Sequence, residues 1–85
     1  MKISYYHDSG HGWYRVSLKA LKALGISDKV TPWSYRYGAS VYLEEDTDAG
    51  LLFEALAIKG ITPIMYRCKQ EARSRVRSFE SYKPE

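Results

Sequence analysis

The sequence has one cysteine, Cys68, and no apolar run long enough to cross a bilayer. A single cysteine excludes an intramolecular disulfide, so nothing in the composition indicates an oxidising compartment. Residues 1–7 also lack the apolar segment of a signal peptide. These absences predict a cytosolic protein, and a length of 85 residues predicts one domain with a limited core.

Charge is unevenly distributed along the chain, although the net charge is only +3. Residues 44–54 carry five acidic side chains and no basic one, whereas residues 67–77 carry five basic side chains and one acidic one. Two clusters of opposite sign either meet in the fold or present two different faces to partners. The small net charge is by itself weak support for nucleic-acid binding.

The hydrophobic pattern predicts seven secondary-structure elements. Alternation of apolar and polar residues is typical of strands, and apolar residues three and four apart are typical of helices. We expect strands over residues 2–7, 13–16, 33–37, 40–44 and 63–68, and helices over residues 18–24 and 49–59. The order ββαββαβ predicts an α+β fold, in which a mainly antiparallel sheet carries both helices on one face.

The expected helices have clear start and stop signals. Ser17 is a good N-cap for the first helix, and residues 46–48 are all able to cap the second. Gly25 and Gly60 are each followed by isoleucine, which is the pattern of a glycine C-cap. The helices are expected to pack on the sheet through Leu18, Leu21, Leu24, Leu52, Ala55 and Leu56.

The remaining residues divide the chain into a compact domain over 1–69 and a basic C-terminal tail over 70–85. Apolar residues from 72 to 79 recur at helical spacing, but residues 73–79 also alternate with period two. Neither period decides whether the tail is helical, extended or disordered. The second pattern would place three arginines along one side: Arg73, Arg75 and Arg77.

The first expected turn holds two imidazoles and a carboxylate within five residues: His7, Asp8 and His11. Neutral imidazole is the commonest metal ligand, and a further ligand could come from the acidic turn at residues 44–48. The competing interpretation, which we favour, is a hairpin turn whose side chains bind the backbone. Helix capping and arginine pairing similarly explain the acidic turn, which lacks EF-hand spacing. We therefore expect no bound metal or cofactor and no catalytic residue.

Candidate partner-binding residues combine aromatic rings with both charge clusters: Trp33, Tyr35, Tyr37, Tyr42, Glu44, Glu45, Asp46, Arg73, Arg75 and Arg77. The arginines could grip phosphates, with the rings of nearby residues 66, 79 and 82 stacking on bases. Arginine also pairs bidentately with carboxylates, so the same residues would bind an acidic protein or fold back onto residues 44–48. The aromatic cluster is better explained by sheet packing, and Cys68 by a buried strand.

Three segments resemble a family of small proteins carried by bacteriophages and plasmids. They are HDSGHGW at 7–13, SYRYG through VYLEEDTD at 34–48, and RSRVRSF at 73–79. The resemblance brings no catalytic residue, cofactor or substrate, but it implies the setting of a mobile element. Short accessory proteins of such elements often bind a host macromolecule, including components of host defence.

Three functions follow as expectations. The first is a non-enzymatic interaction protein in the bacterial cytoplasm, which binds a host protein or nucleoprotein and inhibits host defence in the manner of an anti-CRISPR. The second is a nucleic-acid-binding module that uses the basic C-terminal segment. The third is a small metal-dependent hydrolase that uses His7, Asp8, His11 and the acidic turn.

Overall fold

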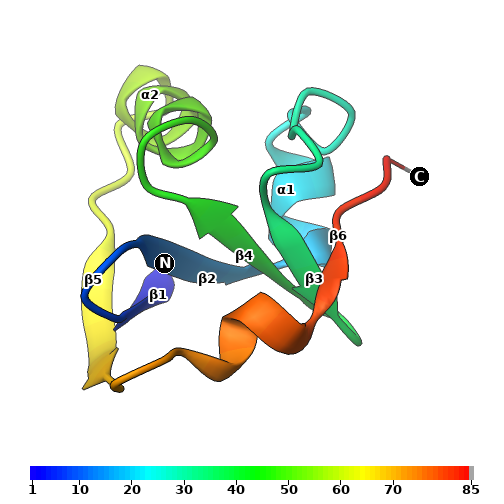
Figure 1. Cartoon of the computed structure of the whole chain (residues 1–85). Helices are drawn as coiled ribbons and strands as arrows, with labels where there is room; N and C mark the ends of the chain where they lie inside the picture. Colours follow the sequence, from blue (N-terminus) through cyan, green and yellow to red (C-terminus); the bar gives the residue numbers. More distant parts are fainter. Residues whose placement is uncertain (85) are drawn as a thin grey trace.

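The computed structural model describes residues 1–84, which form a six-stranded sheet with two helices on one side (Figure 1). The elements are β1 (Lys2–His7), β2 (Gly12–Ser17), α1 (Leu18–Ala23), β3 (Tyr35–Tyr37), β4 (Ser40–Glu44), α2 (Ala49–Ile58), β5 (Ile64–Gln70), the 3₁₀ turn η1 (Arg75–Ser78) and β6 (Glu80–Ser81). The strand order is β5-β1-β2-β4-β3-β6, with β5 parallel to β1 and every other neighbour antiparallel. The predicted α+β class is confirmed.

The helix boundaries follow the local signals in the sequence. Ser17 Oγ accepts a hydrogen bond from Ala20 N at 3.1 Å, so it caps α1 as expected. Gly25 takes a φ of 74°, and Ile26 N donates to Leu21 O at 3.0 Å, which closes the helix and buries the isoleucine. Gly60 ends α2 in the same conformation.

Asp48 stands at the N-cap position of α2, but its side chain does not cap the helix. Its buried Oδ2 instead accepts from Thr31 N at 3.0 Å, Thr31 Oγ1 at 2.8 Å and Ser34 Oγ at 2.5 Å. Ser34 Oγ also accepts from Glu44 N at 3.0 Å. The prediction of a side-chain cap was wrong because the loop before β3 supplies competing donors, which tie that loop to the start of α2.

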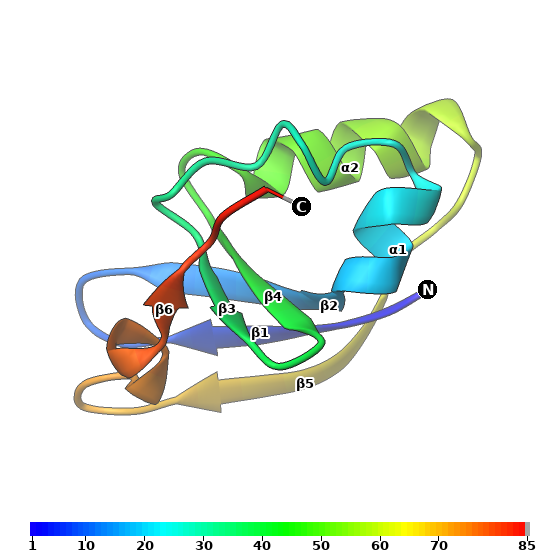
Figure 2. The ribbon, with the colours of Figure 1, turned by 90° about the vertical axis from the view of Figure 1, so that its right-hand side faces the viewer.

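Both helices cover one face of the sheet (Figures 1 and 2), and buried side chains of the helices and strands belong to the main core. It contains the expected Leu18, Leu21, Leu52 and Leu56, with Leu24 and Ala55 partly buried at its margin. The sheet contributes apolar residues at alternate strand positions: Ile3, Val16, Val41 and Leu43. Each buried side chain of this size contributes about 1.5–3 kcal/mol relative to exposure. Within residues 1–84, no helix has the length and apolar character that a membrane span requires.

The C-terminal segment crosses the sheet on the face opposite the helices and then pairs with β3 through β6 (Figure 1). Val76 of η1 is fully buried and forms a second cluster with Trp13 and Tyr42. Tyr82 is also fully buried, in the main core, and its hydroxyl donates to Ser27 O at 2.5 Å. The segment is therefore neither a long helix nor a long strand. We call residues 71–82 the strap, because they cover part of the second sheet face.

Among residues 1–84, strand β5 lies at one edge of the sheet and pairs with β1 alone. Every residue of β5 except Lys69 is exposed, including Cys68. The expectation that Cys68 lies in a buried strand was wrong. The apolar residues of β5 are typical of a core strand, but the position of β5 at the edge of the sheet leaves their side chains in contact with solvent.

Candidate functional site

The sheet face opposite the helices carries basic, acidic and aromatic side chains that could bind a ligand or partner. Strand alternation places core residues such as Ile3 and Val16 on one face and their neighbours on the other. The registers pair Ser4 with Arg15 and Arg67, and Tyr6 with Trp13 and Lys69, so these residues share one face. The strap crosses this face and divides its open part into two regions.

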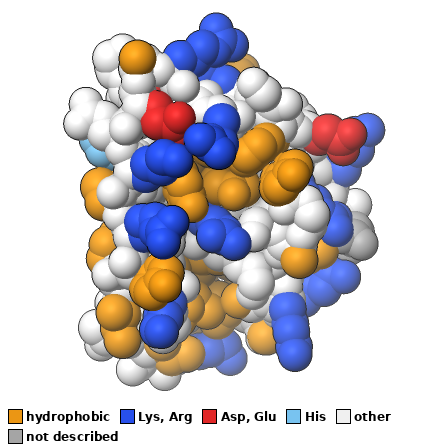
Figure 3. Space-filling model, turned by 90° about the horizontal axis from the view of Figure 1, so that it is seen from below, with side chains coloured by type: hydrophobic (Ala, Val, Ile, Leu, Met, Phe, Trp, Pro, Cys, Tyr) orange, Lys and Arg blue, Asp and Glu red, His pale blue; other side chains and the backbone are white. Residues whose placement is uncertain are grey.

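The first region, which we call the basic face, is defined by Lys2, Arg15, Arg67, Lys69 and Arg75. Figure 3 views this side of the molecule and shows Lys and Arg side chains gathered with hydrophobic ones between them, while acidic side chains are sparse. Glu71 lies 3.6 Å from Arg75, but that arginine side chain is 63% exposed. The Glu71 side chain is 24% exposed, and 3.6 Å is too long for a hydrogen bond, so the donors of Arg75 remain able to bind an anion.

Aromatic rings accompany these cations. Tyr66 is 62% exposed, with Lys2 Nζ 5.1 Å and the Arg67 guanidinium carbon 5.9 Å from its ring centroid. Tyr37 is 66% exposed and stacks on Phe79 with a centroid distance of 4.7 Å. A shallow hollow of about 230 Å³ lies between Tyr37 and the basic side chains of β5. The basic face therefore offers flat apolar surfaces beside exposed positive charges.

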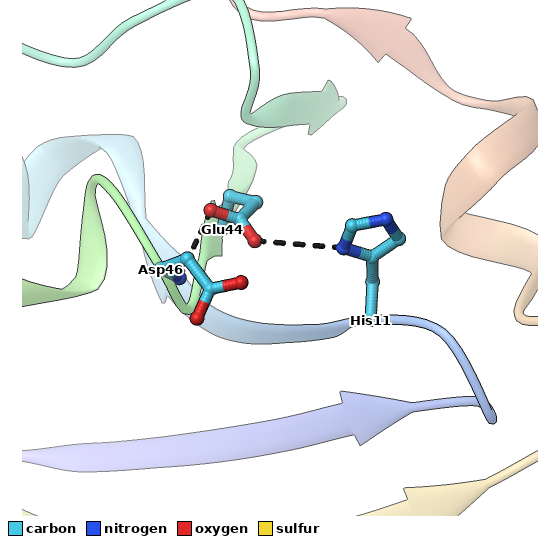
Figure 4. Close-up of side chains that lie close together, drawn as sticks. All are labelled: His11, Glu44 and Asp46. Atoms are coloured by element: carbon cyan, nitrogen blue, oxygen red, sulfur yellow. Dashed lines mark hydrogen bonds and ion pairs between the residues drawn. The ribbon is translucent and has the colours of Figure 1, made fainter.

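The second region, which we call the aromatic pocket, has a volume of about 330 Å³ and lies where β2 begins and β4 ends. Its apolar walls are the rings of Trp13, Trp33 and Tyr35. Its polar walls include His11, Glu44 and Asp46, which Figure 4 shows facing one another. Trp33 is 72% exposed, so the pocket is open to solvent on that side.

The three polar side chains come from the β1–β2 turn and the end of β4. Candidate ligand atoms of His11, Glu44 and Asp46 all lie within 4.8 Å of one another. His11 Nδ1 is 3.7 Å from Glu44 Oε1. Glu44 Oε2 accepts from Asp46 N and from Thr47 Oγ1, each at 2.9 Å, so the carboxylate is fixed in orientation. This arrangement can hold a cation or a cationic group.

Trp13 supplies an unsatisfied donor at the same place. Its side chain is buried, and Nε1 has no hydrogen-bond partner within residues 1–84. A buried donor without an acceptor costs about 1–3 kcal/mol. The centroid of the His11 ring lies 6.1 Å from that of the indole, and the Arg77 guanidinium carbon lies over the indole at 5.4 Å. The same side chain lines the aromatic pocket, but its Nε1 atom is closed to solvent.

Arg77 is itself held by Asp8, whose oxygens accept from Arg77 Nε at 2.6 Å and Nη2 at 2.8 Å. Asp8 also accepts from the backbone of Ser74, Gly10 and His11. The hydrogen bonds from Arg77, and then those from the backbone, hold the pKa of Asp8 far below its ordinary range. Asp8 is thus a structural anion that joins the first turn to the strap.

The structure separates several residues that the sequence grouped. Of the three residues grouped in the first turn, only His11 joins Glu44 and Asp46, because His7 stacks on Tyr5 and Asp8 is occupied by Arg77. Glu45 lies apart and accepts from the Tyr5 hydroxyl at 2.9 Å. Burial, together with this hydrogen bond, raises the pKa of Tyr5 to about 12.

The residues predicted to bind a partner also lie in different environments. Trp33 and Tyr37 are exposed, Tyr35 is half-buried in the wall of the aromatic pocket, and Tyr42 is buried beneath the strap. Among the arginines, Arg77 pairs with Asp8, Arg75 reaches Glu71, and Arg73 is exposed. The alternating arginines of the tail thus face three different environments.

Lys2 and Arg15, which complete the basic face, were not predicted from the sequence as binding residues. Each stands at a strand position whose neighbours are core residues, and that alternation was the available signal. The parallel pairing of β1 with β5 brings Ser4 beside Arg67, and no local pattern indicates that pairing.

No family model, curated protein or solved structure matches the chain. Its function is therefore inferred from the geometry of the basic face and the aromatic pocket.

Proposed function

We propose that this protein binds single-stranded nucleic acid through the basic face. The observation that carries the proposal is the convergence of five cationic side chains from β1, β2, β5 and η1 onto one open surface. Neutralisation of phosphates by Lys and Arg releases condensed counterions, which drives such binding. The local excess of charge supports the proposal more strongly than the net charge of +3 does.

The acidic turn does not oppose this role. Glu44 and Asp46 line the aromatic pocket, and Glu45 binds Tyr5. Within residues 1–84, the ion pairs of Arg75 and Arg77 are made with Glu71 and Asp8 rather than with this turn. A phosphate backbone on the basic face therefore meets cations without first displacing the acidic cluster.

Exposed rings favour an unpaired strand over a duplex. Tyr66 and Tyr37 present ring surface beside the cations, and base–aromatic stacking contributes about 1–3 kcal/mol per base. Bases in a duplex are already stacked on one another, so they do not reach such rings. In the mobile-element setting that the resemblance implies, the strand would belong to a host nucleoprotein such as a defence complex, which the protein would inhibit by occupying it.

Fluorescence anisotropy with labelled oligo-dT and oligo-U tests the proposal. The variant Arg15→Ala/Arg67→Ala/Lys69→Ala removes three cations of the basic face, all of them on strands and none in the core. The control Lys19→Ala/Lys22→Ala/Lys59→Ala removes the same charge from exposed positions on the helical side. We expect the first variant to lose most of the affinity and the control to keep it. Equal losses would show that only overall charge matters.

A second candidate, binding of a host protein, is favoured by the open edge of β5. Ile64 and Met65 are 59% and 50% exposed on a strand whose outer side has no partner within residues 1–84. Such an edge accepts a further strand, with main-chain hydrogen bonds supplying affinity. Quantitative affinity capture should then yield a partner whose recovery falls in Ile64→Ser/Met65→Ser. Recovery that is unchanged in this variant would exclude the edge as the binding surface.

A further inference from the structure

We propose that His11, Glu44 and Asp46 bind a first-row divalent cation, Mn²⁺ or Zn²⁺, at the wall of the aromatic pocket. This site is additional to nucleic-acid binding, because the cluster lies apart from the basic face and has the opposite charge. It also differs from the grouping suggested by sequence spacing, since His7 and Asp8 take no part.

The distances fit a shared ion better than a direct contact. At 3.7 Å, His11 Nδ1 and Glu44 Oε1 are too far apart for a hydrogen bond. Two ligands at about 2.0–2.1 Å from one tetrahedral Zn²⁺ lie about 3.3–3.4 Å apart. The spread of 4.8 Å across the three residues requires a small closure, which exposed His11 and Asp46 side chains can make by rotation.

The buried member of the cluster is already oriented as a ligand. Its second oxygen, Glu44 Oε2, is occupied by Asp46 N and Thr47 Oγ1. These contacts leave Oε1 directed toward His11, as Figure 4 shows. Hydrogen bonds that fix a ligating carboxylate in this way commonly support metal sites.

Trp13 lies at the same place and has an unsatisfied polar atom. Its Nε1 is a buried donor without a partner in residues 1–84, and its ring lines the same pocket as the cluster. A cation held by three protein groups keeps open positions for water or an anion. The pocket, with a volume of about 330 Å³, has room for such a water or anion beside the Trp13 ring.

The donor set selects among cations. Imidazole suits Zn²⁺ and its neighbours, carboxylates suit Mn²⁺, and hard Ca²⁺ and Mg²⁺ prefer oxygen alone. Arg77 also lines the pocket, but Asp8 balances its charge through two hydrogen bonds. The net environment of the cluster therefore favours a cation.

The full chain can be titrated with Mn²⁺ while electron paramagnetic resonance measures the concentration of free Mn²⁺. Zn²⁺ should compete with Mn²⁺ for the same site. We expect one Mn²⁺ per chain, with affinity at least tenfold weaker in His11→Ala and in Asp46→Asn. His7→Ala is the matched control, because His7 is the other histidine and lies outside the cluster. It should bind as the parent does.

Thermal melting provides a second readout, since a ligand of the native state raises Tm by mass action. Mn²⁺ or Zn²⁺ should raise Tm in the parent and in His7→Ala but not in His11→Ala, and metal-free melts establish that each variant folds. Absence of binding at 1 mM Mn²⁺, taken as roughly the weakest useful affinity, would overturn the site. Equal loss in the two histidine variants, or Ca²⁺ binding that is unaffected by His11→Ala, would overturn it as well.

Discussion

Arg77 and Asp8 lie 69 residues apart in the chain, yet they are joined by two hydrogen bonds of 2.6 and 2.8 Å. The pair ties the strap to the β1–β2 turn, and Asp8 at the same time accepts from Ser74 N at 2.9 Å. An arginine in a basic tail is thus a structural residue. The strap that it anchors covers Trp13 and Tyr42 and limits the open sheet face to the basic face and the aromatic pocket.

Acid stability should depend on Asp8. Because its pKa is lower in the folded state than in the unfolded chain, its contribution is present above about pH 4 and is lost as the pH falls below that value. Asp8→Asn should lower Tm at pH 7 and make Tm less sensitive to acid. Thermal melts between pH 7 and 2 check this, with the exposed Asp28→Asn as control. If the decrease of Tm with falling pH were the same in Asp8→Asn as in the parent, the role of Asp8 in anchoring the strap would be contradicted.

Alkaline stability should depend on Tyr5. Its pKa is raised to about 12, so the folded state favours the neutral phenol. The contribution is complete below about pH 10 and is lost as the pH rises toward 12. Tyr5→Phe should flatten the stability profile in this range. Urea unfolding at pH 8 and pH 11 compares the two proteins, and an equal decrease in both would assign the effect to other tyrosines.

The strap should contribute to folding through Val76. This side chain is fully buried against Trp13 and Tyr42. Val76→Ala should lower the free energy of unfolding by about 1–3 kcal/mol, because it leaves a cavity beneath the strap. Denaturant unfolding gives the value. Exposed Ala72→Gly is a control in the same segment, and a decrease no larger than in that variant would mean that the strap is not part of the cooperative unit.

Truncation of a core side chain on the helical side should lower the free energy of unfolding more than Val76→Ala does. Leu56 is 1% exposed in the main core, so Leu56→Ala should cost about 2–5 kcal/mol. The neighbouring Ile58 is 78% exposed on the same helix, and Ile58→Ala should change stability little. Urea unfolding of the two variants should therefore differ clearly. Similar decreases would contradict the direction in which α2 presents its apolar face.

Local patterns were sufficient to predict most of the fold. Ser17, Gly25 and Gly60 act within one helical turn, and the alternation in residues 40–44 is visible without knowledge of the partner strands. The β3–β4 turn at Gly38 is similarly local, with a φ of 58°. Each of these features depends on neighbours in sequence, which is why the sequence was informative.

The remaining features depend on residues distant in sequence. The edge position of β5 requires its parallel pairing with β1, and the strap requires the ties of Arg77 to Asp8 and of Tyr82 to Ser27. His11 meets Glu44 only because β2 pairs with β4. Composition identified the residue types of the site but could not indicate which of them share a face.

The salt dependence of nucleic-acid binding tests the central claim most directly. For a single strand, each phosphate that a cationic side chain neutralises adds about 0.7 to the slope of log K against log salt concentration. Arg15→Ala/Arg67→Ala/Lys69→Ala should therefore reduce the slope by about 2 relative to the parent, while the helical-side control should leave it unchanged. Negligible binding of the parent at about 0.15 M salt, or equal slopes in all three proteins, would contradict the proposed role of the basic face.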